Sequence, residues 1–130
     1  FKVGNAGATT AMTINTSGNI SVGNVTMSGD LTVQGTLYET SDLNLKDNVK
    51  VIKKSLTTIT KIRGVDFDWK STGQHCSGVI AQEVEAVLPH LVNVSQLGDK
   101  TVNYNGLIGV LIEAIKELNK KVKALEKRNP

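Results

Sequence analysis

The sequence is poor in the residues from which small folds often take their stability. Only 4% of its 130 residues are aromatic, and it has one cysteine, two prolines and two histidines. The single cysteine, Cys76, excludes an internal disulfide, and the isolated His75 and His90 have no metal-ligand spacing around them. With so few aromatic residues we do not expect a large monomeric core, so stability should come partly from association.

Several function classes lack their usual signals. There is no apolar run long enough to cross a membrane and no signal peptide, and no basic stripe is interleaved with aromatic residues. Gly73 and Gly78 form no phosphate-binding motif, and Gln82, Glu83 and Glu85 lack a matched second acid. We therefore expect no cofactor, no metal, no nucleic acid and no membrane. Because the first residue is not methionine, we expect a fragment of a longer chain.

Charge divides the chain into two parts. Residues 1–40 carry only Lys2, Asp30 and Glu39, whereas residues 41–130 carry 14 of the 15 basic and 10 of the 12 acidic side chains. The change falls at Ser41-Asp42-Leu43-Asn44-Leu45-Lys46. We therefore predict a domain boundary between residues 40 and 41.

Residues 1–40 contain a short repeat. Glycines alternate with apolar–polar–apolar triplets, which occupy residues 20–22, 25–27 and 31–33. This pattern is typical of very short strands, which cannot bury enough surface alone. Stacked or intertwined chains would solve that problem, so we predict the end of an elongated β-stalk made of three chains. The alternative is a flexible linker rich in Gly, Ser and Thr.

Residues 41–103 predict a small mixed domain. An apolar stripe spaced 4-3-4-3 predicts a helix over 41–62, with Ser41 as its N-cap; the stripe is Leu45, Val49, Ile52, Leu56 and Ile59. Residues 65–69 alternate as a strand and pair with a second strand near 79–80. A short helix over 82–88 ends before Pro89, and strands at 91–94 and 100–104 flank a turn at Gly98-Asp99.

The last segment, residues 104–128, has the strongest pattern. Apolar residues occupy alternating a and d heptad positions, namely Ile108, Leu111, Ile115, Leu118, Val122 and Leu125. The helix could pack on its own domain or join neighbouring chains. Ile or Val at a with Leu at d favours two strands, which conflicts with a three-chain stalk. The fold class is therefore α+β, a short β-stalk followed by a mixed domain with a long C-terminal helix.

Five stretches in order resemble a known family. They are Ser41–Val49, Val65–Trp69, Gly78–Glu85 with Leu88-Pro89, Val102–Tyr104 and Ala114–Leu118. Residues 41–130 resemble the C-terminal intramolecular chaperone domain of bacteriophage tailspikes and tail fibres, a self-cleaving serine peptidase family of the endosialidase-tailspike type. The family often has Arg where this chain has Asn44, which puts one local contact in doubt.

The resemblance implies a homotrimer that folds its own stalk and then cuts itself off. The family's Ser-Lys dyad corresponds to Ser41 and Lys46, and the scissile bond to Thr40–Ser41. The fibre would belong to the virion tail and assemble in the host cytoplasm, with residues 41–130 released. Asp42 either positions the reacting groups or, as we prefer, complements a helix dipole.

The chemistry fits these residue types. Ser41 needs a base, and a lysine amine serves as one when burial keeps it uncharged. Residues five apart do not share a helix face, so Lys46 reaches back past one turn or serves a neighbouring chain. One alternative is a permanent fibre tip with a host-binding role and no chemistry. Another, ranked last, is the self-cleaving domain of a membrane-bound transcription factor.

Overall fold

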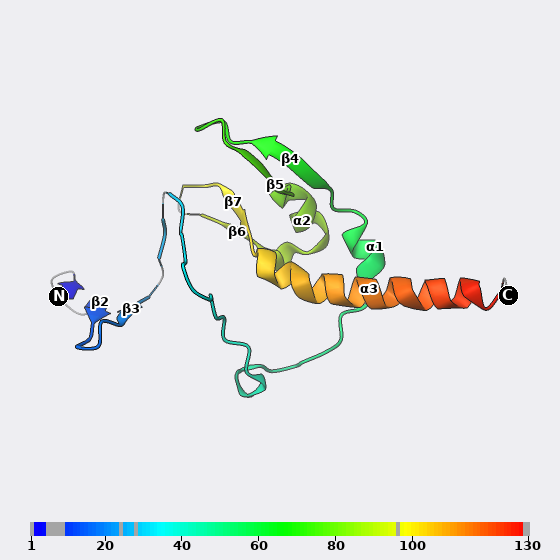
Figure 1. Cartoon of the computed structure of the whole chain (residues 1–130), viewed down its shortest axis with the longest axis horizontal. Helices are drawn as coiled ribbons and strands as arrows, with labels where there is room; N and C mark the ends of the chain where they lie inside the picture. The colour runs from blue at the N-terminus through cyan, green and yellow to red at the C-terminus, as the bar shows by residue number, and fades with distance from the viewer. Residues whose placement is uncertain (1, 5–9, 24, 28, 96, 129–130) are drawn as a thin grey trace. The chain divides into compact units, whose positions relative to one another are not determined.

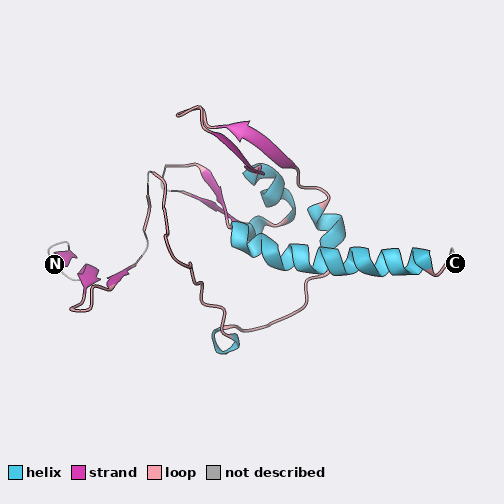
Figure 2. Cartoon of the chain, in the orientation of Figure 1, coloured by secondary structure: helices cyan, strands magenta, loops and turns pink. Residues whose placement is uncertain are grey.

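The computed structural model describes residues 2–4, 10–23, 25–27, 29–95 and 97–128. It divides into an N-terminal unit, Phe1–Leu45, and a C-terminal unit, Lys46–Pro130. Helices and strands are both present, and the longest element is the helix near the C-terminus (Figures 1 and 2). The expected α+β class is confirmed at this level. Stalk positions 1, 5–9, 24 and 28, and residues 129–130, lie outside the described residues.

The N-terminal unit contains one small antiparallel sheet. Its strands are β1 (Lys2–Gly4), β2 (Thr10–Ile14) and β3 (Ile20–Val22), in the order β1-β2-β3. The β2–β3 turn uses Gly18 at φ 78°, a left-handed conformation that glycine adopts without strain. The predicted strand at 20–22 is therefore confirmed. The triplets at 25–27 and 31–33 form no strand, because these segments have no neighbouring strand to pair with in a single chain.

The predicted helix over 41–62 is wrong. The chain instead forms a single 3-10 turn, η1 (Leu43–Leu45), then a segment without regular structure, then the five-residue helix α1 (Ser55–Ile59). Asn48 at φ 54° and Lys54 at φ 58° adopt left-handed conformations, which interrupt a right-handed helix. Leu45 and Val49, on the predicted apolar stripe, are exposed. A helical segment whose apolar side chains are not buried is marginal, so only the last part of the predicted helix, which packs on α3, is formed.

Two hairpins and a short helix form the body of the C-terminal unit. Strands β4 (Gly64–Asp68) and β5 (His75–Val79) pair antiparallel with Phe67 opposite Cys76. The predicted hairpin is confirmed, although its second strand lies at 75–79 and not at 79–80. Helix α2 (Ala81–Val87) ends near Pro89, which begins the 3-10 turn η2 (Pro89–Leu91). Strands β6 (Val92–Val94) and β7 (Lys100–Val102) form the second predicted hairpin.

The long helix α3 (Tyr104–Glu126) completes the unit and supplies part of its core. Asn103 caps it, because its Oδ1 accepts a hydrogen bond from Gly106 N at 2.9 Å. The buried core brings together side chains from α2, η2 and α3, namely Val84, Leu88, Leu91, Leu107 and Val110. Helix α1 also packs on α3. This core is small, as the low aromatic content predicts.

Candidate functional site: the Ser41–Lys46 segment and its surroundings

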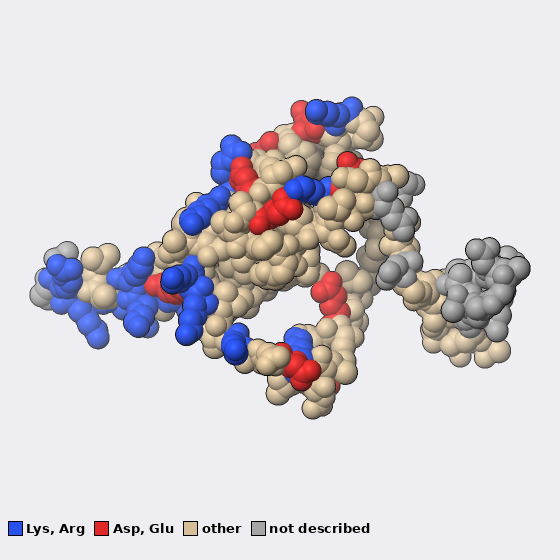
Figure 3. Space-filling model, turned by 180° about the vertical axis from the view of Figure 1, so that it is seen from behind, with Lys and Arg blue, Asp and Glu red and all other residues tan. Residues whose placement is uncertain are grey.

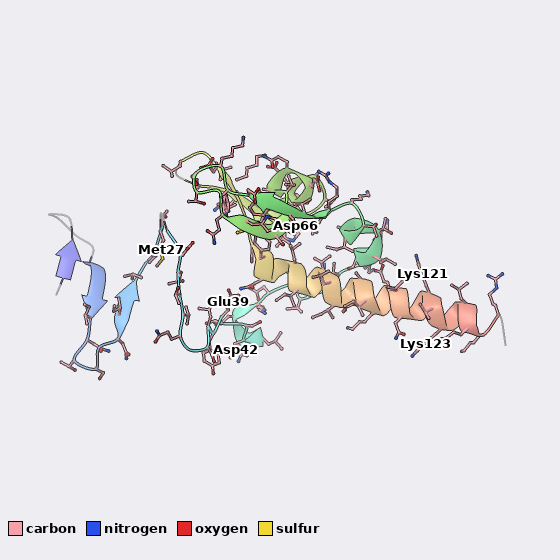
Figure 4. The ribbon with its side chains drawn as sticks, turned by 45° about the horizontal axis from the view of Figure 1, so that its top comes forward. Met27, Glu39, Asp42, Asp66, Lys121 and Lys123 are labelled. Atoms are coloured by element: carbon pink, nitrogen blue, oxygen red, sulfur yellow. The ribbon has the colours of Figure 1, made fainter. Side chains whose placement is uncertain are left out.

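Ser41 lies in the exposed segment before η1. Thr40, Ser41 and Asp42 are all exposed. Asp42 rather than Ser41 precedes the helical turn, and its Oδ1 accepts a hydrogen bond from Asn44 N at 2.8 Å (Figure 4). The helix that Ser41 was expected to cap is not formed, and Asp42, expected to complement a helix dipole, instead accepts a hydrogen bond at the start of the turn.

Lys46 is the first residue of the C-terminal unit and is exposed. The boundary between the two units therefore falls within the predicted dyad, between Leu45 and Lys46. A single chain buries neither residue. A lysine amine favours its uncharged form only when it is removed from water, so a base at Lys46 needs a further covering surface.

The segment around Lys46 carries apolar side chains that the chain leaves in water. Relative exposure is 69% at Leu43, 74% at Leu45, 63% at Val49 and 72% at Val51. Four large aliphatic side chains within nine residues of sequence are thus exposed, and exposed apolar side chains in such numbers are typical of segments that contact other molecules. The residues next to Lys46 in the sequence therefore offer apolar side chains to which a covering surface could bind.

Helix α3 has two apolar faces with different exposure. One face packs in the core through Leu107, Val110 and Ala114, spaced 3 and 4 residues apart. The other face, here called the heptad stripe, is exposed and comprises Ile108, Leu111, Ile115, Leu118, Val122 and Leu125. Packing on its own domain is therefore confirmed for one face of α3, and association with other chains through the other face stays a prediction. Lys121 and Lys123 project from different sides of α3 (Figure 4).

The acidic residues of α2 form ion pairs. Arg63 Nε donates to Glu83 Oε1 at 2.8 Å, and Arg63 N donates to Glu83 Oε2 at 3.0 Å. These hydrogen bonds lower the pKa of Glu83 and raise that of Arg63. Glu85 pairs with Lys100. The prediction that these carboxylates make contacts rather than catalyse is consistent with this geometry.

Sequence reasoning missed one concave feature, here called the aromatic pocket. It has a volume of about 440 Å³, and its lining includes Phe67, Trp69, Ile80, Gln82, Lys100, Thr101 and Tyr104. Three of the five aromatic residues of the chain meet there. The clustering of scarce aromatic residues in 67–104 is the signal that could have indicated it.

Three further features concern basic side chains, metal-binding groups and membrane-spanning helices. Basic side chains gather over the C-terminal half of α3 and the turn that follows it (Figure 3). They are Lys116, Lys120, Lys121 and Lys123 on the helix and Lys127 and Arg128 after it. Among the residues that the structure describes, no group of three metal-binding side chains occurs. No helix in the described ranges is long and apolar enough to cross a bilayer.

Comparison with known proteins places this domain in a family. Residues 41–93 match the family model Peptidase_S74, described as chaperone of endosialidase. The long tail fiber protein Gp37 of Salmonella phage S16 is 33% identical over 103 residues, covering 71% of this chain and 14% of that protein. The corresponding protein of Enterobacteria phage K3 is 35% identical over 101 residues, covering 71% and 8%.

A relative that is not a phage protein is also found. Myelin regulatory factor homolog 1 of Caenorhabditis elegans is 28% identical over 101 residues, covering 68% of this chain and 11% of that protein. The chain therefore spans about a seventh or less of the length of these curated relatives. Residues 41–93 therefore match the chaperone of endosialidase family, and about 100 residues of the chain are similar to the long tail fiber proteins of two phages.

Proposed function

We propose that this chain is a self-processing trimeric chaperone of a phage tail fibre. Three copies associate, the stalk ahead of residue 41 folds in register, and the chain is then cut at Thr40–Ser41. The observation that carries the proposal is that the family match begins at residue 41, at the serine predicted to be the nucleophile. The serine is thus the first residue of the matched domain.

The heptad stripe supports assembly of several copies. The domain core uses the other face of α3, and the six stripe residues stay about half exposed in the described part of the chain. Ile115 is 65% exposed and Leu118 is 50% exposed. Fully burying an aliphatic side chain is worth about 1.5–3 kcal/mol, so covering the exposed half of each stripe residue contributes about 1 kcal/mol, which over six residues is large beside the stability of a small domain. Association through the stripe would recover this free energy, and three chains suit an intertwined stalk.

Cleavage proceeds in two steps. Ser41 Oγ attacks the carbonyl carbon of Thr40 while Lys46 Nζ, uncharged, accepts the hydroxyl proton. The Thr40–Ser41 amide bond breaks as the ester bond forms, and Lys46 returns the proton to the departing amine. Water then hydrolyses the ester, which leaves a Thr40 carboxylate and restores the serine hydroxyl. The attacking serine belongs to the cut chain or to a neighbouring one.

Assembly is the trigger for this chemistry. Lys46 is exposed in one chain and is flanked by exposed Leu45 and Val49. When a neighbouring copy covers these apolar side chains, Lys46 loses water and the neutral amine becomes favoured. Cleavage before assembly, which would separate the chaperone from an unfolded stalk, is thereby avoided. Asp42 holds the turn that follows Ser41 and so positions the nucleophile.

Mass spectrometry of the purified chain beside Ser41→Ala tests the proposal. Wild type should give two masses that correspond to residues 1–40 and 41–130, and Ser41→Ala should give one full-length mass. A wild-type trimer that keeps a single mass over days would contradict the peptidase part. That result would favour a permanent trimeric fibre tip that makes host contact without chemistry.

A further inference from the structure

The aromatic pocket has fixed walls. Phe67 and Trp69 pack edge to face with ring centroids 5.2 Å apart. Tyr104 Oη accepts a hydrogen bond from Val79 N at 3.3 Å, which ties α3 to the end of β5. A Cβ at Gly78 would lie 2.7 Å from Tyr104 Oη, so glycine allows this close approach. The pocket is therefore formed before any ligand arrives.

The lining of the pocket suits an uncharged, apolar chain segment. Its only charged side chain, Lys100, is paired with Glu85. Two runs of consecutive residues, 79–82 and 100–102, line the pocket. Trp69 and Tyr104 are each 53% exposed, so both rings offer apolar area to a ligand. At about 440 Å³ the pocket lies within the range of sites for small groups.

One segment of this chain has the matching chemistry. Residues 31–38 carry no charge, and their apolar side chains are exposed: 64% at Leu31, 45% at Val33, 66% at Leu37 and 88% at Tyr38. The segment forms no strand in the described structure. Extended segments with alternating apolar side chains bind by placing those side chains in pockets beside a strand.

We propose that the aromatic pocket holds an apolar side chain of residues 31–38 from a second copy while the stalk is still unfolded. This rests on the proposed chaperone function and identifies where the stalk is held. An intertwined stalk requires each chain to be aligned against its neighbour, which is why the occupant comes from another copy. Release follows when the stalk buries these side chains in its own interior.

Photo-crosslinking during refolding tests this. The full chain carries Ser41→Ala, so that its parts stay joined, and a benzophenone amino acid replaces Thr101 in the pocket. The control has the same amino acid at Lys123, an exposed position on α3 outside the pocket. Equal amounts of ¹⁴N and ¹⁵N chains are refolded together and illuminated at intervals, and crosslinked peptides are identified by mass spectrometry.

The expected result is mixed-isotope crosslinks from position 101 to residues 31–38, several-fold above those from position 123. They should decline as refolding ends, and the triple variant Leu31→Ser, Val33→Ser, Leu37→Ser should lose them. Equal yields from both positions, crosslinks within one chain only, crosslinks to a folded neighbouring domain, or none at all would overturn the proposal. Position Gln82 is a second site for the benzophenone if the Thr101 variant does not fold.

The same samples separate this proposal from the proposed function. Light scattering gives the number of chains, and the parent chain with Ser41 restored gives cleavage. Trimers that cut themselves without crosslinks from the pocket would overturn only the docking site. Crosslinks to residues 31–38 in a chain that never cuts itself would retain the docking site and remove the peptidase.

Discussion

The carboxylate of Glu117 on α3 caps the start of α1 at Ser55. Glu117 Oε1 accepts from Ser55 N at 2.9 Å and Oε2 accepts from Leu56 N at 3.0 Å, across more than sixty residues of chain. Glu117 continues the buried row of Leu107, Val110 and Ala114. No side chain at Lys54 caps this helix, so the long-range carboxylate takes that role.

We expect removal of this cap to destabilise the C-terminal unit. Glu117→Ala leaves two helix N–H groups without their acceptor and should lower the free energy of unfolding by about 1–3 kcal/mol. Glu117→Gln keeps one carbonyl acceptor and should cost less. Urea denaturation at one fixed protein concentration measures both effects, because association also changes the apparent stability.

Ser55→Ala is the matched control for this cap. Ser55 is fully buried, and its hydroxyl has no hydrogen-bond partner within the described structure, while its backbone N–H donates to Glu117. Alanine keeps the N–H and removes the unpaired hydroxyl, so stability should stay equal or rise. If Ser55→Ala were as destabilising as Glu117→Ala, the carboxylate would not be the source of the stability.

Two glycines in α3 should respond in opposite ways to the same change. A Cβ at Gly106 would lie 2.4 Å from Leu91 Cδ2 in the core, whereas a Cβ at Gly109 would lie 3.5 Å from Ile52 Cδ1. Gly106→Ala should cost about 1–3 kcal/mol by overpacking. Gly109→Ala should gain up to about 1 kcal/mol from helix propensity. Thermal unfolding of both variants checks this prediction. Equal shifts of the melting temperature in the two variants would contradict it.

The Glu83–Arg63 pair predicts a specific response to acid. Its hydrogen bonds lower the pKa of Glu83 in the folded chain. The stabilisation is therefore complete above the unfolded pKa of a glutamate, about 4.3, and is lost as pH falls through the lower folded value. Arg63→Gln removes the side-chain bonds and keeps the backbone N–H to Glu83. The stability difference between wild type and variant should shrink from pH 6 to pH 3 in urea titrations. A constant difference would contradict the assignment.

The parts of the fold that the sequence predicts are those set by local pattern. Both hairpins of the C-terminal unit, α2 and α3 follow from alternation, turn residues and periodicity. The helix over 41–62 fails because the first residues of its apolar stripe, Leu45 and Val49, are exposed, whereas only the last part of the stripe packs on the domain as α1. The Glu117 cap could not be predicted, because it joins residues distant in sequence.

Some features of the candidate site could likewise be predicted from the sequence, and others could not. The Ser-Lys spacing is visible in the sequence, and the exposure of Lys46 is not. The aromatic pocket depends on the approach of Tyr104 to Gly78, which only the folded chain produces. The dyad at Ser41 and Lys46 stays a prediction, and two further variants test it.

Lys46→Ala should abolish self-cleavage, because without its amine no group accepts the Ser41 proton. General base catalysis contributes about 10²–10⁴-fold, so the full-length chain should persist for at least a hundred times longer than wild type. Lys50→Ala is the matched control, since it removes an exposed lysine four residues further along the same segment. Electrophoresis of timed samples measures both. An equal loss of self-cleavage in the two variants would indicate a general charge effect and would contradict the role of Lys46.

Ile115→Asp should separate the copies and, with them, stop cleavage. Ile115 lies in the middle of the heptad stripe and is 65% exposed, so the change should leave the domain folded while it places a charge in the interface. Lys120→Asp, on the same helix outside the stripe, is the control and should keep the wild-type number of chains. Light scattering gives the mass of the assembly, and mass spectrometry gives the cut fraction. If a neighbouring copy buries Lys46, as we propose, a monomeric Ile115→Asp chain should stay whole at every concentration. A monomer that cuts itself at the wild-type rate would show that one chain builds the site alone, and assembly could then no longer be the trigger.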